Sequence, residues 1–494
     1  MPHIDFDTIP GSIRVPGQYI EFNTRNAVQG LPQNPQKVLM VAPMLTAGIQ
    51  PALEPVQLFS DAEAADLFGQ GSLAHLMVRQ AFANNPYLDL TVIGIADHSA
   101  GVQATATVTL SGTATAPGVV EITIGGKQAT ATVTLSGTAT APGVVEITIG
   151  GKQVSTAVNT GETAATVADR LKTAITAADV TVTASGSGAA VTLTAKHKGE
   201  IGNESGLTVS TGNTGLTYQA NAFTGGAKNA DIATALSKVA GKHYHIICSP
   251  FSDDANAKAL SNHITNVSNA IEQRGCIGVL GMSAALSTAT TATGEINDGR
   301  MTCAWYKGAV EPNGIIAAGY AAVLAFEEDP AKPLNTLEIK GLAVTPDAQW
   351  PLFAECNNAL YNGLTPLTVV NNRVQIMRAV STYTKSANNT DDPALLDITT
   401  IRTLDYVRRS VKERIALRFP RDKLSDRLLP KVKSEILDVL IKLDQAEIIE
   451  NAEANKGKLV VARAQNDPNR VNAIIPADVV NGLHVFAGRI DLIL

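Results

Sequence analysis

The chain has 494 residues, too many for a single hydrophobic core, so two to four domains are expected. Hydrophobic residues make up 45% and charged residues 17%, which excludes a wholly disordered protein. The net charge of -6 argues against a general nucleic-acid binder. The longest uncharged apolar run, residues 314–326, is too short to cross a bilayer, and the first residues show no signal peptide, which predicts a protein made in the cytoplasm.

The first part of the chain alternates between strands and helices. Residues 1–27 are punctuated by Pro and Gly and are expected to form an extended arm with a short strand at Tyr19, Ile20, Glu21 and Phe22. Ser60 followed by Glu63 forms a capping box that opens a helix. The order of strand, helix and strand indicates an α/β layer. Strands are predicted at residues 37–42 and 88–95, and helices at 60–68 and 73–83.

The composition changes at Ala96, and as far as Gly226 the chain is rich in Thr, Ala, Val and Gly. Within this stretch residues 103–127 recur without change as residues 128–152. Each copy predicts a β-hairpin, because two alternating runs flank an Ala-Pro-Gly turn and a Gly-Gly turn follows. Two identical copies indicate a recent duplication at an exposed, tolerant tip. We therefore expect residues 97–226 to form a β-rich domain inserted into the α/β domain.

The alternation of strands and helices resumes after the insert. This order predicts a mostly parallel sheet with both faces covered. The expected strands are residues 243–249, 275–282, 302–307, 367–370 and 374–377, and the expected helices are residues 257–274, 284–297 and 312–328.

The last ninety residues combine two amphipathic helices with short strands. Apolar residues recur at helical spacing over 401–415 and again over 432–443. Strands are expected at 458–463, at 470–475 and at 485–494, the last of which runs to the chain end. That terminal strand places Phe486, Ile490, Leu492 and Leu494 on one face, so it requires a partner strand in its own domain or in another subunit.

A basic cluster lies within the two helices. Between Arg402 and Lys433 there are eleven Lys or Arg and four Asp or Glu, a net charge of +7. Two interpretations stay open: a solvated helix face with internal pairs such as Arg409–Glu413, or a docking surface for an acidic partner. Nucleic acid is the weaker partner, because aromatic residues for base stacking are nearly absent. The candidate surface residues are Arg402, Arg408, Arg409, Lys412, Lys431 and Lys433.

The motifs of catalysis and cofactor binding are missing from the sequence. There is no GxGxxG after a strand, no GxxxxGK[ST], no GxSxG and no HExxH. Ser185-Gly186-Ser187-Gly188 resembles part of a nucleophile elbow but lies in the β-rich insert. The four cysteines are widely spaced and are expected to be small buried side chains. We therefore expect neither an enzyme nor a protein with a cofactor or metal.

The two ends of the chain resemble the contractile phage tail sheath proteins. Residues 15–21, Val-Pro-Gly-Gln-Tyr-Ile-Glu, are similar to the opening of that family, and residues 59–72 look like the segment after its first strand. The closing run, from Asp467-Pro468-Asn469-Arg470 to Leu494, is similar to the Mu-like branch. The doubled hairpin departs from the single copy expected in the family.

The resemblance implies a structural subunit and a set of partners. Sheath subunits stack as hexameric rings around a tail tube, exchange terminal arms by strand addition, and contract to drive the tube through the host envelope. It implies assembly in the host cytoplasm into the virion tail, contact with the tube protein, a baseplate and a tail terminator, and neither nucleic acid nor membrane insertion. The alternatives are a degenerate subtilisin-like or other α/β hydrolase and a non-contractile β-rich surface protein.

The expected fold is therefore an α/β core domain with a mostly parallel sheet, an inserted β-rich domain, an α+β C-terminal domain, and extended arms at both ends. The expected parts are an N-terminal arm (1–27), the core domain (28–96 and 227–385), the protruding insert (97–226), a tube-facing C-terminal domain (386–482) and a C-terminal arm strand (483–494).

Overall fold

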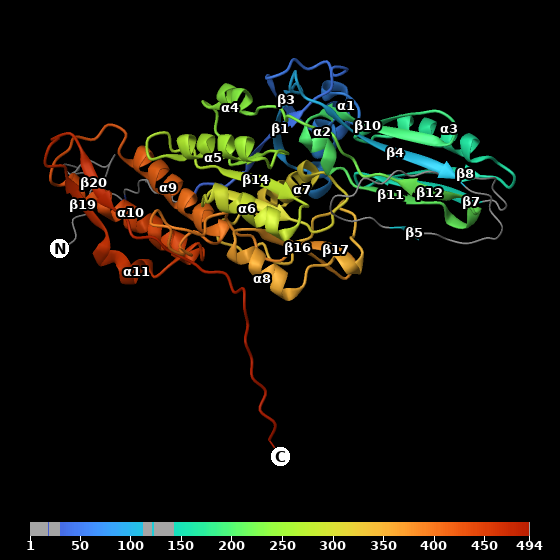
Figure 1. Ribbon diagram of the computed structural model, residues 1–494. Coiled ribbons are helices and arrows are strands. Elements are labelled where there is room, and N and C mark those ends of the chain that lie inside the picture. The colour runs from blue at the N-terminus through green and yellow to red at the C-terminus, as the bar shows by residue number, and fades with distance from the viewer. Residues whose placement is uncertain (1–17, 19–29, 112–120, 123–142, 494) are drawn as a thin grey trace. The chain divides into compact units, whose positions relative to one another are not determined.

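The structure is a computed structural model, and it describes residues 18, 30–111, 121–122 and 143–493. By their internal contacts the residues divide into two compact units. Unit 1 comprises residues 1–34 and 406–480, and unit 2 comprises residues 35–405 and 481–494. Figure 1 traces the chain through both units.

Unit 2 is built on an eight-stranded sheet in the order β17-β16-β15-β14-β13-β1-β3-β2. The six inner strands are parallel, whereas β2 and β17 join the two edges antiparallel. The predicted mostly parallel sheet is present, as a mixed sheet. Its strands are β1 (Lys37–Pro43), β2 (Pro55–Leu58), β3 (Asp89–Ile95), β13 (Ile246–Cys248), β14 (Ile277–Met282), β15 (Met301–Trp305), β16 (Thr365–Val370) and β17 (Arg373–Ile376).

Helices cover both faces of this sheet. Successive side chains of a strand point to opposite faces, and in β14 a Cβ on Gly278 would meet Ile264 of α5, whereas one on Gly281 would meet Ile316 of α7. Every residue from Asn313 to Ala325 is buried, as expected of a helix that is apolar all round. The helices are α1 (Asp61–Phe68), α2 (Leu73–Asn84), α4 (Ala233–Val239), α5 (Asp254–Ser268), α6 (Leu286–Ile296), α7 (Asn313–Phe326) and α8 (Phe353–Tyr361), with a 3₁₀ turn η3 (Asp347–Gln349).

Helix α1 begins as the sequence predicts, with one difference. The Ser60 hydroxyl accepts a hydrogen bond from Glu63 N at 3.2 Å. The Glu63 carboxylate accepts from Phe59 N at 3.1 Å rather than from Ser60 N. The Glu63 side chain therefore bonds to the residue before the N-cap, and the motif still satisfies two backbone donors, those of Phe59 and Glu63.

The insert between β3 and α4 has its own hydrophobic core, formed by two four-stranded sheets and helix α3. One sheet has the order β12-β4-β10-β9 and the other β5-β11-β7-β8. Its elements are β4 (Gln103–Ser111), β5 (Glu121–Ile122), β7 (Gly143–Ile149), β8 (Lys152–Val158), α3 (Ala164–Ala177), β9 (Val182–Ser185), β10 (Ala190–Lys198), η1 (Glu200–Glu204), β11 (Leu207–Ser210), η2 (Gly212–Thr214) and β12 (Thr217–Ala220).

The duplicated segment does not fold as two hairpins. Strands β4 and β5 of the first copy lie in different sheets, so the hairpin prediction is wrong for that copy. In the second copy the predicted Gly-Gly turn is present at Gly150-Gly151, where it joins β7 to β8, while the rest of the predicted hairpin, residues 128–142, lies outside the described residues. Strand β11 has β5 on one side and β7 on the other. Ile122 and Ile147, which are equivalent in the two copies, both pair with Val209.

Unit 1 is an α+β unit around a small core of its own. All five apolar residues predicted on the inner face of the second helix are buried. The predicted strands at 458–463 and 470–475 form an antiparallel pair. The elements are the second part of α9 (Ile398–Arg418), α10 (Leu428–Gln445), β18 (Ile449–Glu450), α11 (Ala452–Asn455), η4 (Lys456–Lys458), β19 (Val460–Arg463), β20 (Val471–Ile474) and β21 (Asp478–Val479).

The boundary between the units falls inside α9, whereas the sequence placed a domain boundary at 385/386. Ile398 belongs to the core of unit 2, and Asp405 is ion-paired with Arg300 of that unit. The first two turns of α9 therefore pack as part of unit 2, and the rest of the helix, from Tyr406 to Arg418, packs in unit 1.

Candidate functional site

The first residue of the predicted basic surface, Arg402, is a buried structural residue. Its side chain is 7% exposed. Nη2 donates hydrogen bonds to Leu324 O at 3.3 Å and to Glu327 O at 2.5 Å, at the carboxyl end of α7. Burial lowers the pKa of Arg402 to about 10. The prediction of a surface role for Arg402 is wrong, because the face of α9 opposite its apolar arc is covered here by α7, whose last carbonyls the guanidinium caps.

Arg408 and Arg409 lie at the start of the unit 1 part of α9, and both are partly buried. The Arg409 guanidinium lies 5.3 Å from the centre of the Tyr406 ring. It donates to Gln33 O and, at 3.1 Å, to Asn34 Oδ1. The pair with Glu413 that the sequence suggested is present at 3.7 Å. Arg409 thus holds the segment at residues 33–34 against α9.

Lys412 and Lys431 are exposed and Lys433 is partly buried. Three further basic residues, Arg421, Lys423 and Arg427, are exposed in the connection between α9 and α10. The exposed basic residues of this stretch therefore gather where α9 ends and α10 begins. We call this stretch, residues 412–433, the basic segment.

Two arginines of the same stretch serve the packing of α9 on α10, which the sequence analysis missed. The Arg414 side chain is 5% exposed and reaches Asp438 Oδ2 at 2.6 Å and Glu435 Oε2 at 3.1 Å. Arg418 lies 3.4 Å from the same Glu435. The sequence contained a signal for this contact. Arg414 and Arg418 are four residues apart and therefore lie on one face of α9, and Glu435 and Asp438 are three residues apart and lie on one face of α10.

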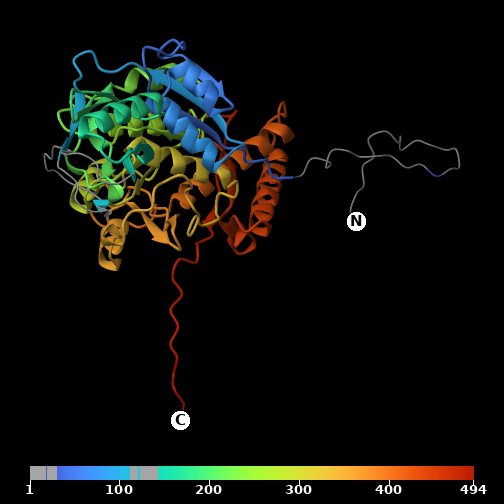
Figure 2. The ribbon, with the colours of Figure 1, turned by 90° about the vertical axis from the view of Figure 1, so that its right-hand side faces the viewer.

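The structure describes the C-terminal residues predicted to form an arm, but not the N-terminal ones. Tyr19, Ile20, Glu21 and Phe22 lie outside the described residues. The terminal strand is not formed: residues 481–493 carry no regular secondary structure, and the segment extends away from unit 2 (Figure 1, Figure 2). The exposed fractions of Phe486, Ile490 and Leu492 are 88%, 99% and 83%. A strand exists only by pairing, and the described part of the chain provides this segment with no paired strand.

The start of this segment, in contrast, contacts the rest of unit 2 through His484. His484 Nε2 lies 3.4 Å from Asp397 Oδ1, and its Nδ1 lies 2.9 Å from Asn335 Nδ2. Arg378 also donates two hydrogen bonds of 2.8 Å to the Asp397 carboxylate. The sequence analysis missed this contact, although a histidine within an apolar run was its signal.

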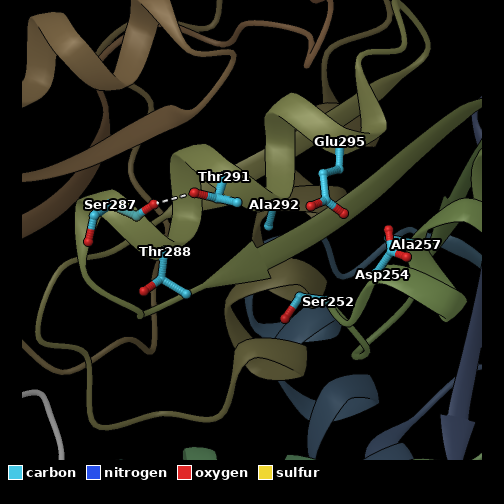
Figure 3. A pocket seen from close by; sticks show the side chains of 8 residues that line it. All are labelled: Ser252, Asp254, Ala257, Ser287, Thr288, Thr291, Ala292 and Glu295. Carbon is cyan, nitrogen blue, oxygen red and sulfur yellow. Dashed lines mark hydrogen bonds between the residues drawn. The ribbon is translucent and has the colours of Figure 1, made fainter.

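A cavity of about 530 Å³ opens where α/β enzymes commonly keep their sites, beyond the carboxyl ends of β13 and β14. Figure 3 shows its lining, with side chains from the start of α5 and from along the length of α6. Among these residues there is no His or Cys to serve as base or nucleophile. Asp254 is paired with Lys258 at 2.5 Å, and Lys258 also lies 3.7 Å from Glu295. The cavity therefore offers hydroxyls and neutralised carboxylates, without a nucleophile–base pair.

All four cysteines are buried and free, and burial raises the pKa of the Cys303 thiol to about 12. Within the described residues, His, Cys, Asp and Glu nowhere gather in groups of three that could hold a metal ion. In the same part of the chain, no helix combines the length and the apolar character needed to cross a bilayer.

Family models match three consecutive stretches of the chain. Residues 124–227 match the phage tail sheath protein beta-sandwich domain, residues 225–382 the central domain, and residues 390–493 the phage tail sheath C-terminal domain. The Mu-like prophage FluMu tail sheath protein of Haemophilus influenzae is 32% identical over 99% of this chain and 100% of its own length. The chain belongs to the phage tail sheath protein family.

This sheath protein is a structural protein of the phage tail and not an enzyme. Its fold is similar to that of the sheath tail protein from Desulfitobacterium hafniense, at 14% identity and a TM-score of 0.50, over 94% of this chain and 97% of that one. The sheath tail protein Lin1278 from Listeria innocua gives a TM-score of 0.48 at 15% identity, over 93% and 95% of the two chains. The two-sheet insert corresponds to the beta-sandwich domain, and the resemblance drawn from the chain ends is confirmed.

Proposed function

We propose that this sheath protein polymerises as stacked hexameric rings around a tail tube and contracts to drive the tube through the host envelope. The observation that carries the proposal is the C-terminal segment, which exposes Phe486, Ile490 and Leu492 to solvent. Burying three such side chains in a neighbouring subunit is worth roughly 5–8 kcal/mol before ordering costs. A terminal segment left apolar and unpaired in one subunit is suited to pairing with another.

The mode of contact that we propose is strand addition. Backbone hydrogen bonds then supply affinity, and alternate side chains supply specificity. The β19–β20 sheet of unit 1 is a candidate acceptor, because it has two strands only and exposes Val460 and Ile474. Isolated two-stranded sheets are marginally stable, so added strands from neighbouring arms would complete it. The arms assigned to this exchange are residues 1–27 and 483–494.

The basic segment is proposed to face the tube. Lys412 and Lys431 are its exposed helical lysines, and the turn between the helices adds Arg421, Lys423 and Arg427. Arg402 is left out of this surface, and Arg408, Arg409 and Lys433 lie at its margin. The acidic partner expected there is the tube protein, with the baseplate and a tail terminator at the two ends of the sheath. Assembly is proposed to occur in the host cytoplasm.

The energy for contraction is proposed to be stored in assembly. The sequence contains no nucleotide-binding motif, so an extended sheath would be a metastable arrangement of the same subunits. A difference of about 1–3 kcal/mol per subunit is ordinary for a change of interface, and it sums over every ring.

Truncation tests this function directly. Removal of residues 1–22 or of residues 485–494 should leave folded subunits, seen by circular dichroism, that form no tubes in electron micrographs. The full chain is the control and should give striated hollow cylinders. Normal cylinders from either truncation would refute the role of that arm.

A further inference from the structure

The C-terminal segment has a single point of attachment to unit 2. Of residues 481–493, only Gly482 and His484 are partly buried, and their neighbours Leu483 and Val485 are 80% and 77% exposed. The His484 side chain itself is 13% exposed. The arm therefore leaves the subunit at one residue rather than along a packed stretch.

The contacts of His484 suit a neutral imidazole. Nδ1 can accept a hydrogen bond from the Asn335 amide at 2.9 Å, which leaves the ring proton on Nε2, 3.4 Å from Asp397 Oδ1. One tautomer satisfies both contacts. Burial lowers the pKa of His484, with Asp397 acting in the opposite direction and Arg378 in the same one. Each ring nitrogen thus has a polar partner on unit 2.

The residues that hold His484 are themselves fixed. Arg378 binds both carboxylate oxygens of Asp397, and a backbone bridge joins Asp397 to Val380. Gly482 completes the site, because a Cβ at this position would lie 2.6 Å from Pro333 Cγ and 2.7 Å from His484 Nε2. The backbone can follow this path only without a side chain at 482.

We propose that His484 is the positioning residue of the C-terminal arm: its clamp between Asn335 and Asp397 fixes the point and direction from which residues 485–494 leave the subunit. This inference rests on the proposed role of the arm in assembly. With the clamp closed, ten residues follow the anchor and reach about 35 Å. With it open, the free chain begins after β21 at residue 480, so fifteen residues reach about 50 Å.

The position of the arm can be measured in the unassembled full-length subunit. Spin labels on Val485→Cys and Ala270→Cys, both exposed positions of unit 2, report the distance from arm root to core. The four native cysteines are buried and should not react in the folded protein. We expect a narrow distance distribution in the parent and a broad one in His484→Ala and in Asn335→Ala.

Two matched variants separate the clamp from a general effect. His484→Gln can still donate to Asp397 and should restore most of the narrow distribution, whereas Leu483→Ala, at an exposed neighbour, should leave it unchanged. Equal widths in the parent and His484→Ala would overturn the proposal, whatever happens to assembly. Circular dichroism confirms that each variant is folded, and Asn335→Ala provides an independent route should His484→Ala be unfolded.

Assembly supplies the second readout. The longer tether alone lowers the effective concentration of the arm about twofold, and loss of direction adds to this. His484→Ala should therefore raise the concentration needed for tube formation at least about twofold, and His484→Gln should raise it less. If removal of residues 485–494 leaves assembly intact, the proposed role of the arm fails. If that truncation abolishes assembly and His484→Ala changes neither readout, the clamp alone fails.

Discussion

Arg300 and Asp405 form a two-pronged ion pair in which Nη1 lies 2.6 Å from Oδ2 and Nη2 lies 2.9 Å from Oδ1. Arg300 directly precedes β15, and Asp405 ends the part of α9 that belongs to unit 2. Both side chains are largely buried, with 16% and 19% exposed. The pair therefore fixes the first two turns of α9 to the sheet.

Removing one partner should destabilise unit 2. Asp405→Ala leaves a largely buried guanidinium unpaired, and we expect a loss of about 2–4 kcal/mol. Both tryptophans of the chain, Trp305 and Trp350, lie in unit 2, so fluorescence during urea unfolding reports this unit. The exposed pair of Lys385 with Asp391, also in unit 2, provides the control, since Asp391→Ala should cost no more than about 0.5 kcal/mol. A similar small loss for Asp405→Ala would show that the pair is dispensable.

The buried carboxyl of Glu311 should make stability depend on pH. The residue is 2% exposed, Oε1 accepts from Ala343 N at 2.6 Å, and Oε2 has no hydrogen-bond partner among the described residues. Burial raises the pKa of Glu311 to about 7, above its ordinary value of 4.5. The folded state then binds the proton more tightly than the unfolded state. Stability from this group is present below about pH 4.5 and is lost as the pH rises to about 7.

Glu311→Gln removes this titration. The free energy of unfolding of the variant, relative to the parent, should rise by roughly 3 kcal/mol between pH 4 and pH 8. Unfolding by urea at a series of pH values measures the difference. Glu453→Gln, at a side chain that is 64% exposed, should show no such change. Parallel pH profiles of Glu311→Gln and the parent would contradict the prediction.

The duplicated segment allows one substitution to be compared in two places. Ile147 of β7 is fully buried between two partner strands, whereas the equivalent Ile122 lies in β5 at the sheet edge. Ile147→Asp should destabilise the insert by about 3–5 kcal/mol, and Ile122→Asp should do so much less. Thermal unfolding followed by circular dichroism measures both. Equal losses of stability in the two variants would show that the two copies contribute equally to the stability of the insert.

Deletion of residues 128–152 should leave a folded, assembling protein. Because the copies are identical, the remaining one can supply β4 and then β7, which leads into β8 through the same Gly-Gly turn. The pairings of β4 with β10 and of β7 with β11 are then rebuilt, and the β5 edge strand is lost. Melting curves and electron micrographs check this, and loss of folding would show that β5 is required.

The elements that sequence predicted well are those whose partners are close in the chain or whose pattern is strong. Val432, Ile436 and Leu443 repeat at helical spacing, and all three are buried. The hairpin prediction for the first copy of the repeat was wrong because its strands pair with β10, β11 and β12, which lie about 80 to 110 residues away and left no local signal. The prediction of a surface role for Arg402 was wrong for the same reason. Its partners are carbonyls at the end of α7, which no pattern within α9 reveals.

The last prediction concerns contact with the tube. Arg409 holds residues 33–34 of its own chain, so reversing its charge would mix a structural effect with a binding effect. Lys412→Glu together with Lys431→Glu changes exposed charges only. This double variant should still form sheath-only polymer but should fail to co-assemble with tubes, because an attraction across the interface becomes a repulsion.

The parent should lose co-assembly with rising salt, as exposed charges are screened within about 8 Å at physiological ionic strength. Lys456→Glu with Lys458→Glu, at exposed residues outside the basic segment, is the matched control and should co-assemble normally. Sedimentation of mixtures with purified tubes measures the outcome, and normal co-assembly of the Lys412/Lys431 variant would exclude the basic segment as the tube-facing surface.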